Sequence, residues 1–150
     1  MQNKNGIVYV PLGLGGQRWL RIAGCEFRIW AMDKTELEKR TKAFALRVIK
    51  FVASLSKNRV SDVLGYQLLK AGTSVGANYR EANRAESRDD FIHKIGIVEK
   101  EASESQYWLE LFQETDLGDR KDRGWLLQEC GELIAIFTSI GRTAKARRRK

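Results

Sequence analysis

Three arginines spaced four residues apart could bind phosphate groups. Arg80, Arg84 and Arg88 would form one basic stripe if a single helix ran through all three. Like charges at this spacing repel one another, so a polyanion such as RNA or DNA would relieve the repulsion. Glu81 and Glu86 are neighbours in the sequence and could neutralise the stripe instead. The pattern allows either a nucleic-acid contact or a solvated helix face that balances its own charge.

The C-terminal segment is a second candidate for phosphate binding. Residues 142–150 contain no acidic side chain and six basic ones, namely Arg142, Lys145, Arg147, Arg148, Arg149 and Lys150. A short basic arm binds nucleic-acid backbones through charge, so its affinity depends strongly on salt. The alternatives are a patch that binds a membrane surface and a solvated terminus that aids solubility.

The net charge of +8 comes from the two ends of the chain. Residues 1–34 contain five basic and two acidic side chains, and residues 142–150 contain only basic ones. The body of the chain is therefore nearly neutral.

Residues suited to enzymatic or metal chemistry are scarce. His93 is the one histidine and has no glutamate three residues before it, so Glu99, Glu101 and Glu104 lack the partners of a di-iron bundle site. Cys130 lies on an apolar helical pattern, and the sequence offers no general base to activate its thiol. We expect no catalytic residue, no metal, no cofactor and no small-molecule substrate.

A polar row runs along the second helical pattern. It contains Gln67, Ser74, Asn78 and Glu81, and Asn78 falls on the apolar seam itself. A buried asparagine at a seam can fix helix register or oligomeric state. Glu81 could pair with Lys94 across the following hairpin. The row has either this structural role or forms a binding pocket.

Four helices are predicted to position these side chains. Apolar residues recur in alternating steps of three and four, a period of about 3.5 residues that is typical of helices packed at shallow angles. A capping box, Thr35-x-x-Glu38, begins the first helix, which ends near Lys57-Asn58. The second begins at Ser61 or Asp62 and the third at Ser87. The sequence predicts an all-α fold, an antiparallel up-down-up-down four-helix bundle.

Each helix has its own apolar seam. The four seams are Leu37, Thr41, Phe44, Val48, Val52 and Leu55; Leu64, Leu68, Ala71, Val75, Asn78, Ala82 and Ala85; Phe91, Ile95, Val98, Ala102, Ser105, Leu109 and Phe112; and Leu126, Cys130, Leu133, Phe137, Ile140 and Ala144. Further small or apolar residues lie off these seams and suggest subunit contacts: Gly72, Gly76, Trp108, Leu111, Trp125 and Ile136. A wide core stripe within one bundle is the alternative.

Residues 1–31 differ in composition from the rest. They contain five glycines and the only proline, and their apolar residues follow no helical period. We expect a poorly ordered extension, with Met32 as an alternative start of the chain. The bundle is then expected over residues 32–146, followed by a basic tail over 147–150.

Two further features bear on location. Cys25 and Cys130 lie far apart and form no disulfide or metal spacing, which fits a reducing cytoplasm. The longest uncharged stretch near a helix, residues 133–141, is far shorter than the roughly 20 residues that span a bilayer. A cytoplasmic protein without a membrane partner is expected.

One segment resembles a known family. Residues 67–78 read Gln-Leu-Leu-Lys-Ala-Gly-Thr-Ser-Val-Gly-Ala-Asn and are followed by Glu81-Ala82. Further matches to that family are Ser87, Asp90, Phe91, Ile92 and Lys94, then Glu104, Tyr107, Trp108 and Leu109, then Asp116-Leu117 and Thr138-Ser139-Ile140. Over about residues 33–146 the chain resembles the bacterial four-helix-bundle proteins encoded in intervening sequences of 23S ribosomal RNA genes.

The resemblance implies a fold and a class of partner. Members of this family form up-down four-helix bundles and look like homopentamers. A related branch, the accessory variability determinant of diversity-generating retroelements, works with a reverse transcriptase and its RNA. The resemblance thus favours a non-enzymatic scaffold that binds structured RNA or a ribonucleoprotein. A protein-interaction scaffold with no nucleic-acid role is the alternative.

Overall fold

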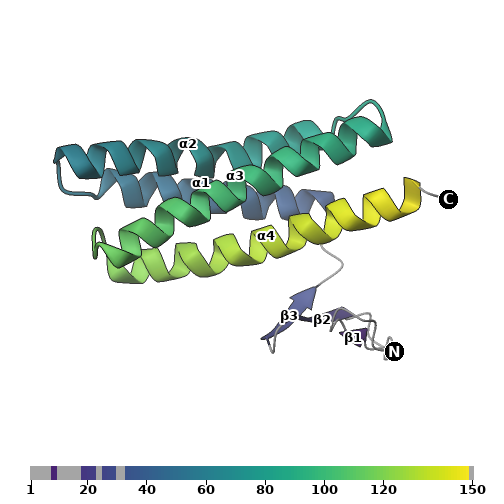
Figure 1. Ribbon diagram of the computed structural model, residues 1–150, viewed down its shortest axis with the longest axis horizontal. Helices are drawn as coiled ribbons and strands as arrows, with labels where there is room; N and C mark the ends of the chain where they lie inside the picture. The colour runs from purple at the N-terminus through teal and green to yellow at the C-terminus, as the bar shows by residue number, and fades with distance from the viewer. Residues whose placement is uncertain (1–7, 10–17, 23–24, 30–32, 149–150) are drawn as a thin grey trace. The chain divides into compact units, whose positions relative to one another are not determined.

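The computed structural model describes residues 8–9, 18–22, 25–29 and 33–148 (Figure 1). The chain divides into two compact units, residues 1–37 and 38–150. The second unit holds the helical bundle, apart from the first turn of its first helix. Within the described residues, none of the helices combines the length and apolar character needed to cross a membrane.

The N-terminal unit contains a small antiparallel sheet. Its strands are β1 (Val8–Tyr9), β2 (Arg18–Ile22) and β3 (Cys25–Ile29), in the order β1-β2-β3. The register pairs Val8 with Arg21 and Leu20 with Phe27. We expected no regular structure in residues 1–31, and these strands differ from that expectation. The stretches 18–22 and 25–29 are rich in aromatic and branched aliphatic residues, which favour strands. The rest of residues 1–31 lies outside the described residues.

Four long helices follow: α1 (Lys34–Ala53), α2 (Arg59–Ala82), α3 (Arg88–Glu114) and α4 (Arg120–Arg148). Contacts between the helices show that they are antiparallel. Gly65 of α2 lies against Val52 of α1, and Gly76 lies against Thr41. Likewise, Arg40 of α1 pairs with Glu129 of α4, whereas the later Arg47 pairs with the earlier Asp122. The predicted antiparallel four-helix bundle is confirmed (Figure 1).

The starts of α1 and α2 differ from the predicted ones because other residues cap these two helices. Asp33 caps α1, since its Oδ1 accepts a hydrogen bond from the Glu36 N–H at 2.8 Å, so the predicted Thr35 capping box is wrong. Asn58 caps α2 by accepting from the Ser61 N–H. The predicted cap Ser87 is confirmed at α3, where its Oγ accepts from the Asp90 N–H at 3.1 Å.

The predicted seams form most of the core. Buried seam residues include Phe44, Val48, Leu68, Val75, Val98, Leu109, Leu126, Leu133 and Phe137. Seam residues at both ends of the bundle are only half-buried. They are Phe91, Ile140 and Ala144 where α3 begins and α4 ends, and Val52, Leu55 and Leu64 where α1 ends and α2 begins. One seam step further in, Ile95 of α3 and Phe137 of α4 are fully buried.

A row of glycines brings α2 close to α1. A Cβ at Gly72 would lie 3.0 Å from a methyl of Val48, and one at Gly76 would lie 3.5 Å from the backbone of Thr41. Both glycines therefore face a helix of the same bundle. Their predicted place in an oligomer interface is wrong, because α1 already occupies the space that a second subunit would need.

Arg123 holds the turn between α3 and α4. Its buried guanidinium donates to the carbonyls of Leu117 and Gly118 and to Oδ1 of Asp116, at 2.6, 3.1 and 2.6 Å. Asp116 and Gly118 have positive φ angles of 52° and 75°. A left-handed residue after a helix exposes carbonyl groups that need donors, and this arginine supplies them.

Candidate nucleic-acid interface

The three spaced arginines do not form one helical stripe. Arg80 lies in the last turn of α2, Arg84 in the connection to α3, and Arg88 is the first residue of α3. The helix ends at Ala82, with Asn83 as its C-cap, and the Asn83 side chain donates to Oε1 of Glu38 at 2.7 Å. The predicted stripe is therefore wrong in its geometry. All three arginines are nonetheless exposed around one connection.

The C-terminal basic residues belong to α4. Arg142 and Lys145 are exposed on this helix, and the backbone remains helical through Arg147 and Arg148. The predicted tail over 147–150 thus begins inside the helix, while Arg149 and Lys150 lie outside the described residues. A helix holds its cations at regular spacing, which a free tail does not.

The fold brings these two basic segments to one end of the bundle. The connection between α2 and α3 and the C-terminal end of α4 lie at the same end (Figure 1). Arg88 of α3 shares a cleft with residues 139–144 of α4. We call this region the basic end and define it by Arg80, Arg84, Arg88, Arg142 and Lys145.

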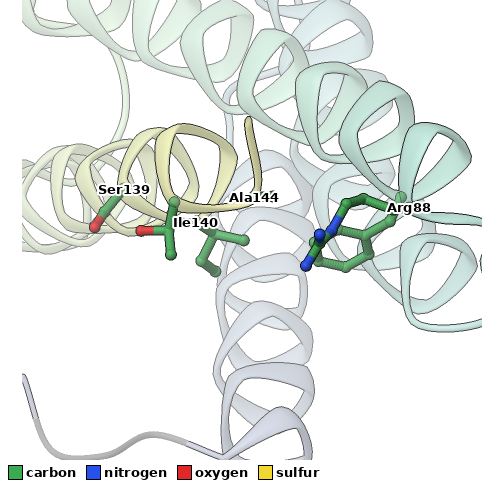
Figure 2. A pocket seen from close by; sticks show the side chains of 6 residues that line it. Arg88, Ser139, Ile140 and Ala144 are labelled. Atoms are coloured by element: carbon green, nitrogen blue, oxygen red, sulfur yellow. The ribbon is translucent and has the colours of Figure 1, made fainter. Parts of the chain in front are cut away.

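The cleft at the basic end has a mixed lining. Its volume is about 330 Å³, and its lining residues are Arg88, Phe91, Ser139, Ile140, Thr143 and Ala144. Figure 2 shows Arg88 on α3, with Ser139, Ile140 and Ala144 along α4. Sequence reasoning placed Phe91, Ile140 and Ala144 on seams and did not identify the cleft. Phe91 is the first residue of its seam, and Ile140 and Ala144 are the last two of theirs; these end positions were the sign of the cleft in the sequence.

Acidic residues also lie at this end: Glu81, Glu86 and Asp89 are exposed, and Asp90 pairs with a cation of its own helix. Lys94 Nζ lies 2.8 Å from Asp90 Oδ2, and this hydrogen bond raises the pKa of Lys94 and lowers the pKa of Asp90. The predicted pair between Lys94 and Glu81 is thus replaced by one within a single helix, four residues apart, where no loop has to be bridged. Glu81 itself is exposed, and its charge contributes to the raised pKa of Lys94.

The polar row of α2 bonds to its own helix. Ser74 Oγ donates to the Lys70 carbonyl at 2.7 Å, and Asn78 Nδ2 donates to the Ser74 carbonyl at 2.9 Å. Gln67 and Asn78 are half-buried rather than core residues. None of the four lines the cleft at the basic end. Asn78 is thus not the fully buried seam residue that was predicted to fix helix register, and both predicted roles of the row stay predictions.

The remaining apolar candidates lie on the outer surface of the bundle. Trp108, Leu111 and Ile136 are half-buried, and Trp125 is exposed beneath the guanidinium of Arg47, 5.1 Å from its ring centroid. Other exposed large apolar side chains were not identified from the sequence: Leu46, Ile49, Val60, Val63, Tyr66 and Tyr107.

Possible metal ligands and the Cys130 thiol were compared with what metal binding and nucleophilic catalysis require. No group of three or more His, Cys, Asp or Glu residues there could hold a metal ion. Cys130 is buried, and its thiol donates to the Ala102 carbonyl at 3.2 Å. Burial raises the pKa of Cys130 to about 12, so the thiolate that a nucleophile requires does not form near neutrality.

Comparison with known proteins identifies the family. Residues 33–139 match the family described as 23S rRNA-intervening sequence protein. The chain belongs to this family. The resemblance seen in the sequence is thereby confirmed, and the match covers the bundle from the residue before α1 into the last third of α4.

A solved structure agrees with this assignment. It is a crystal structure of a protein of unknown function from the S23 ribosomal protein family of Bacteroides thetaiotaomicron VPI-5482. The identity is 35%, with a TM-score of 0.67, covering 73% of this chain and 97% of that chain. A search of curated protein sequences found no match.

Proposed function

We propose that this 23S rRNA-intervening sequence protein is a non-enzymatic, cytoplasmic scaffold that binds structured RNA through its basic end. The observation that carries the proposal is the meeting of two distant basic segments at one end of the bundle. Cations clustered on one surface bind phosphate backbones, while cations scattered over a neutral body do not. The protein acts as a homo-oligomer, a pentamer by analogy with its family. A ribonucleoprotein containing a reverse transcriptase is one such RNA partner.

Charge at the opposite end of the bundle provides a matched control. Arg59 begins α2, and Arg120 and Lys121 begin α4, so these three exposed cations lie far from the basic end. A triple alanine variant of Arg84, Arg142 and Lys145 removes the same charge as a triple alanine variant of Arg59, Arg120 and Lys121. A difference between the two variants then reports location rather than net charge.

The experiment is a salt titration of RNA binding by the full chain. Fluorescence anisotropy with a labelled RNA hairpin measures the affinity from low to physiological salt, and sedimentation in the same buffer gives the oligomer mass. The wild-type affinity is expected to fall steeply with salt, and the basic-end variant to lose about one unit of slope per phosphate contact. Salt-insensitive binding, or equal losses in both variants, would refute the assignment to the basic end.

A protein-interaction scaffold is the second candidate. Val60, Val63 and Tyr66 of α2 are 57%, 55% and 65% exposed, and Tyr107 of α3 is 53% exposed. Exposed aromatic and branched side chains of this kind favour a protein partner. This candidate predicts no RNA binding at low salt by an intact oligomer, and loss of assembly when Val60 and Val63 are replaced by serine.

A further inference from the structure

The cleft at the basic end exists because two apolar seams continue beyond the closed core. Phe91 lies one seam step before Ile95 on α3, and Ile140 lies one step after Phe137 on α4. Ile95 and Phe137 are completely buried, whereas Phe91 and Ile140 are half-buried. An apolar floor is thus left in contact with solvent, which costs free energy unless a ligand or partner covers it.

The groups around this floor can satisfy a polar ligand. Arg88 supplies a guanidinium at the α3 side of the cleft, and Ser139 supplies a hydroxyl from α4 (Figure 2). Thr143, another lining residue, supplies a second hydroxyl from α4. A guanidinium donates to phosphate oxygens, while hydroxyls both donate and accept hydrogen bonds. The ring of Phe91 offers a surface for stacking. The volume of about 330 Å³ lies at the lower end of the range for small-ligand sites, roughly 300–1,000 Å³.

A nucleotide matches this combination of groups. Its base is flat and can stack on an aromatic ring, its edge and sugar carry hydrogen-bonding groups, and its phosphate is an anion. Exposed cations continue beyond the cleft, with Arg84 before α3 and Arg142 and Lys145 along α4. Phosphates on both sides of the bound nucleotide would meet these cations, and this favours a nucleic-acid strand over an acidic peptide, whose side chains would not stack on Phe91.

We infer that the cleft holds one unpaired nucleotide of an RNA strand, with its base on Phe91 and its phosphate at Arg88. The base must be unpaired, because a base inside a duplex cannot expose its face to a side chain. This inference rests on the proposed function and adds to it: the basic end supplies general affinity, and the cleft supplies a preference for loops, bulges or single-stranded ends.

The test compares two RNAs of equal length and charge. One is a hairpin with a seven-nucleotide loop, and the other is a blunt duplex without unpaired residues. Binding of the full chain to each is measured by anisotropy at one salt concentration. The variants are Phe91→Leu, which keeps an apolar side chain and removes the ring, and Thr143→Val, which removes one hydroxyl. Arg88→Ala removes the guanidinium.

The controls have the same chemistry outside the cleft. Tyr107→Leu removes an exposed aromatic ring from α3, and Arg120→Ala removes an exposed arginine from the other end of α4. Thermal unfolding of every variant checks that the bundle is intact. Thr143 and Arg88 are exposed, so Thr143→Val and Arg88→Ala are expected to leave the bundle folded. Their RNA binding can therefore still be compared with wild type if Phe91→Leu destabilises the bundle.

The expected result is a selective loss. Phe91→Leu should weaken hairpin binding about 5- to 100-fold, as expected for the loss of one base–aromatic stack, and leave duplex binding unchanged. Arg88→Ala should weaken hairpin binding and lower its salt slope by about one, whereas both controls behave as wild type. Equal hairpin binding by wild type and Phe91→Leu, or equal losses on both RNAs, overturns the inference while the proposed function stands.

Two further titrations test other ligands for the cleft. Wild-type protein that binds neither RNA overturns both the inference and the proposed function. Adenosine monophosphate is titrated separately. If the wild type binds this nucleotide but neither RNA, and Phe91→Leu loses the nucleotide binding, the cleft is assigned to a free nucleotide. A poly-glutamate peptide serves as the protein-like anion, and its Phe91-dependent binding in place of RNA assigns the cleft to an acidic peptide. Either result overturns the strand-binding inference.

Discussion

A Cβ built on Gly72 of α2 would lie 3.0 and 3.1 Å from the two methyl groups of Val48 on α1. That separation is below an ordinary van der Waals contact, so the two helices approach as closely as they do only because position 72 has no side chain. The same contact explains why a residue with poor helix propensity stands in the middle of a 24-residue helix.

Replacing Gly72 is therefore expected to destabilise the bundle. Gly72→Leu should lower the free energy of unfolding by about 1–3 kcal/mol, because the larger side chain forces α1 and α2 apart. Gly96 of α3 provides the control, since a Cβ there meets nothing within 4 Å. Gly96→Ala should raise stability by about 0.5–1 kcal/mol through helix propensity. Urea denaturation followed by circular dichroism measures both, and a stabilised Gly72→Leu would contradict the close approach.

Arg40 is expected to be the most important cation between α1 and α4. Its Nε lies 2.5 Å from Glu129 Oε1, its Nη2 lies 2.9 Å from Glu129 Oε2, and Nη2 also contacts Glu132. The hydrogen bond that Arg40 donates to Glu129 is the main cause of the raised pKa of Arg40. Arg40→Ala would leave two carboxylates facing each other, and the side chain of Glu129 is only 13% exposed. We expect a loss of about 1–3 kcal/mol in unfolding free energy.

Two comparisons separate this effect from general charge loss. Arg47→Ala removes a cation whose partner Asp122 is 32% exposed, and should cost about 1 kcal/mol or less. Adding Glu129→Gln and Glu132→Gln to Arg40→Ala should restore part of the lost stability, because the buried repulsion disappears. If the triple variant is no more stable than Arg40→Ala, the carboxylates are not the source of the loss.

Asp116 and Arg123 predict a dependence of stability on acid pH. The hydrogen bond from Arg123 lowers the pKa of Asp116 below its usual value. A carboxyl with a lowered pKa in the folded state stabilises the fold above its ordinary pKa, near 4, and loses that contribution as the pH falls through the folded value. Asp116→Asn should therefore be less stable than wild type at pH 6, and the two should converge near pH 2. A constant difference across this range would contradict the ion pair.

Cys130 predicts a dependence at alkaline pH. Because its pKa is raised to about 12 by burial, the folded state keeps the thiol proton after the unfolded state has lost it. Stability should then fall from about pH 8.5 upward, by at most about 1.4 kcal/mol per pH unit. Cys130→Ala should flatten this fall.

The same thiol is expected to resist labelling. In a Cys25→Ser background, a thiol reagent at pH 8 should label Cys130 only after denaturant is added. Rapid labelling of the native protein would show that the packing of Cys130 against Ala102 is absent in solution.

Much of the bundle could be predicted from local patterns. The spacing of Phe44, Val48, Leu68 and Leu133 marks the buried side of three helices, because a helix places residues three and four apart on one face. Ser87 was recognisable as a cap from its side chain alone. The cap of α1 was misplaced by two residues because Asp33 and Thr35 both have capping side chains, and only the backbone geometry distinguishes them.

The sequence by itself determined that the chain forms four amphipathic helices with an excess of positive charge at its ends, since periodicity and charge are properties of neighbouring residues. Tertiary structure decided how those features meet. The end of α2 at Ala82 places Arg84 and Arg88 around a connection, and the antiparallel return of α4 brings residues 139–145 to the same place. The cleft beside Phe91 lies between the start of α3 and the end of α4. Its existence depends on how these two helix ends pack, and they are some fifty residues apart in the sequence.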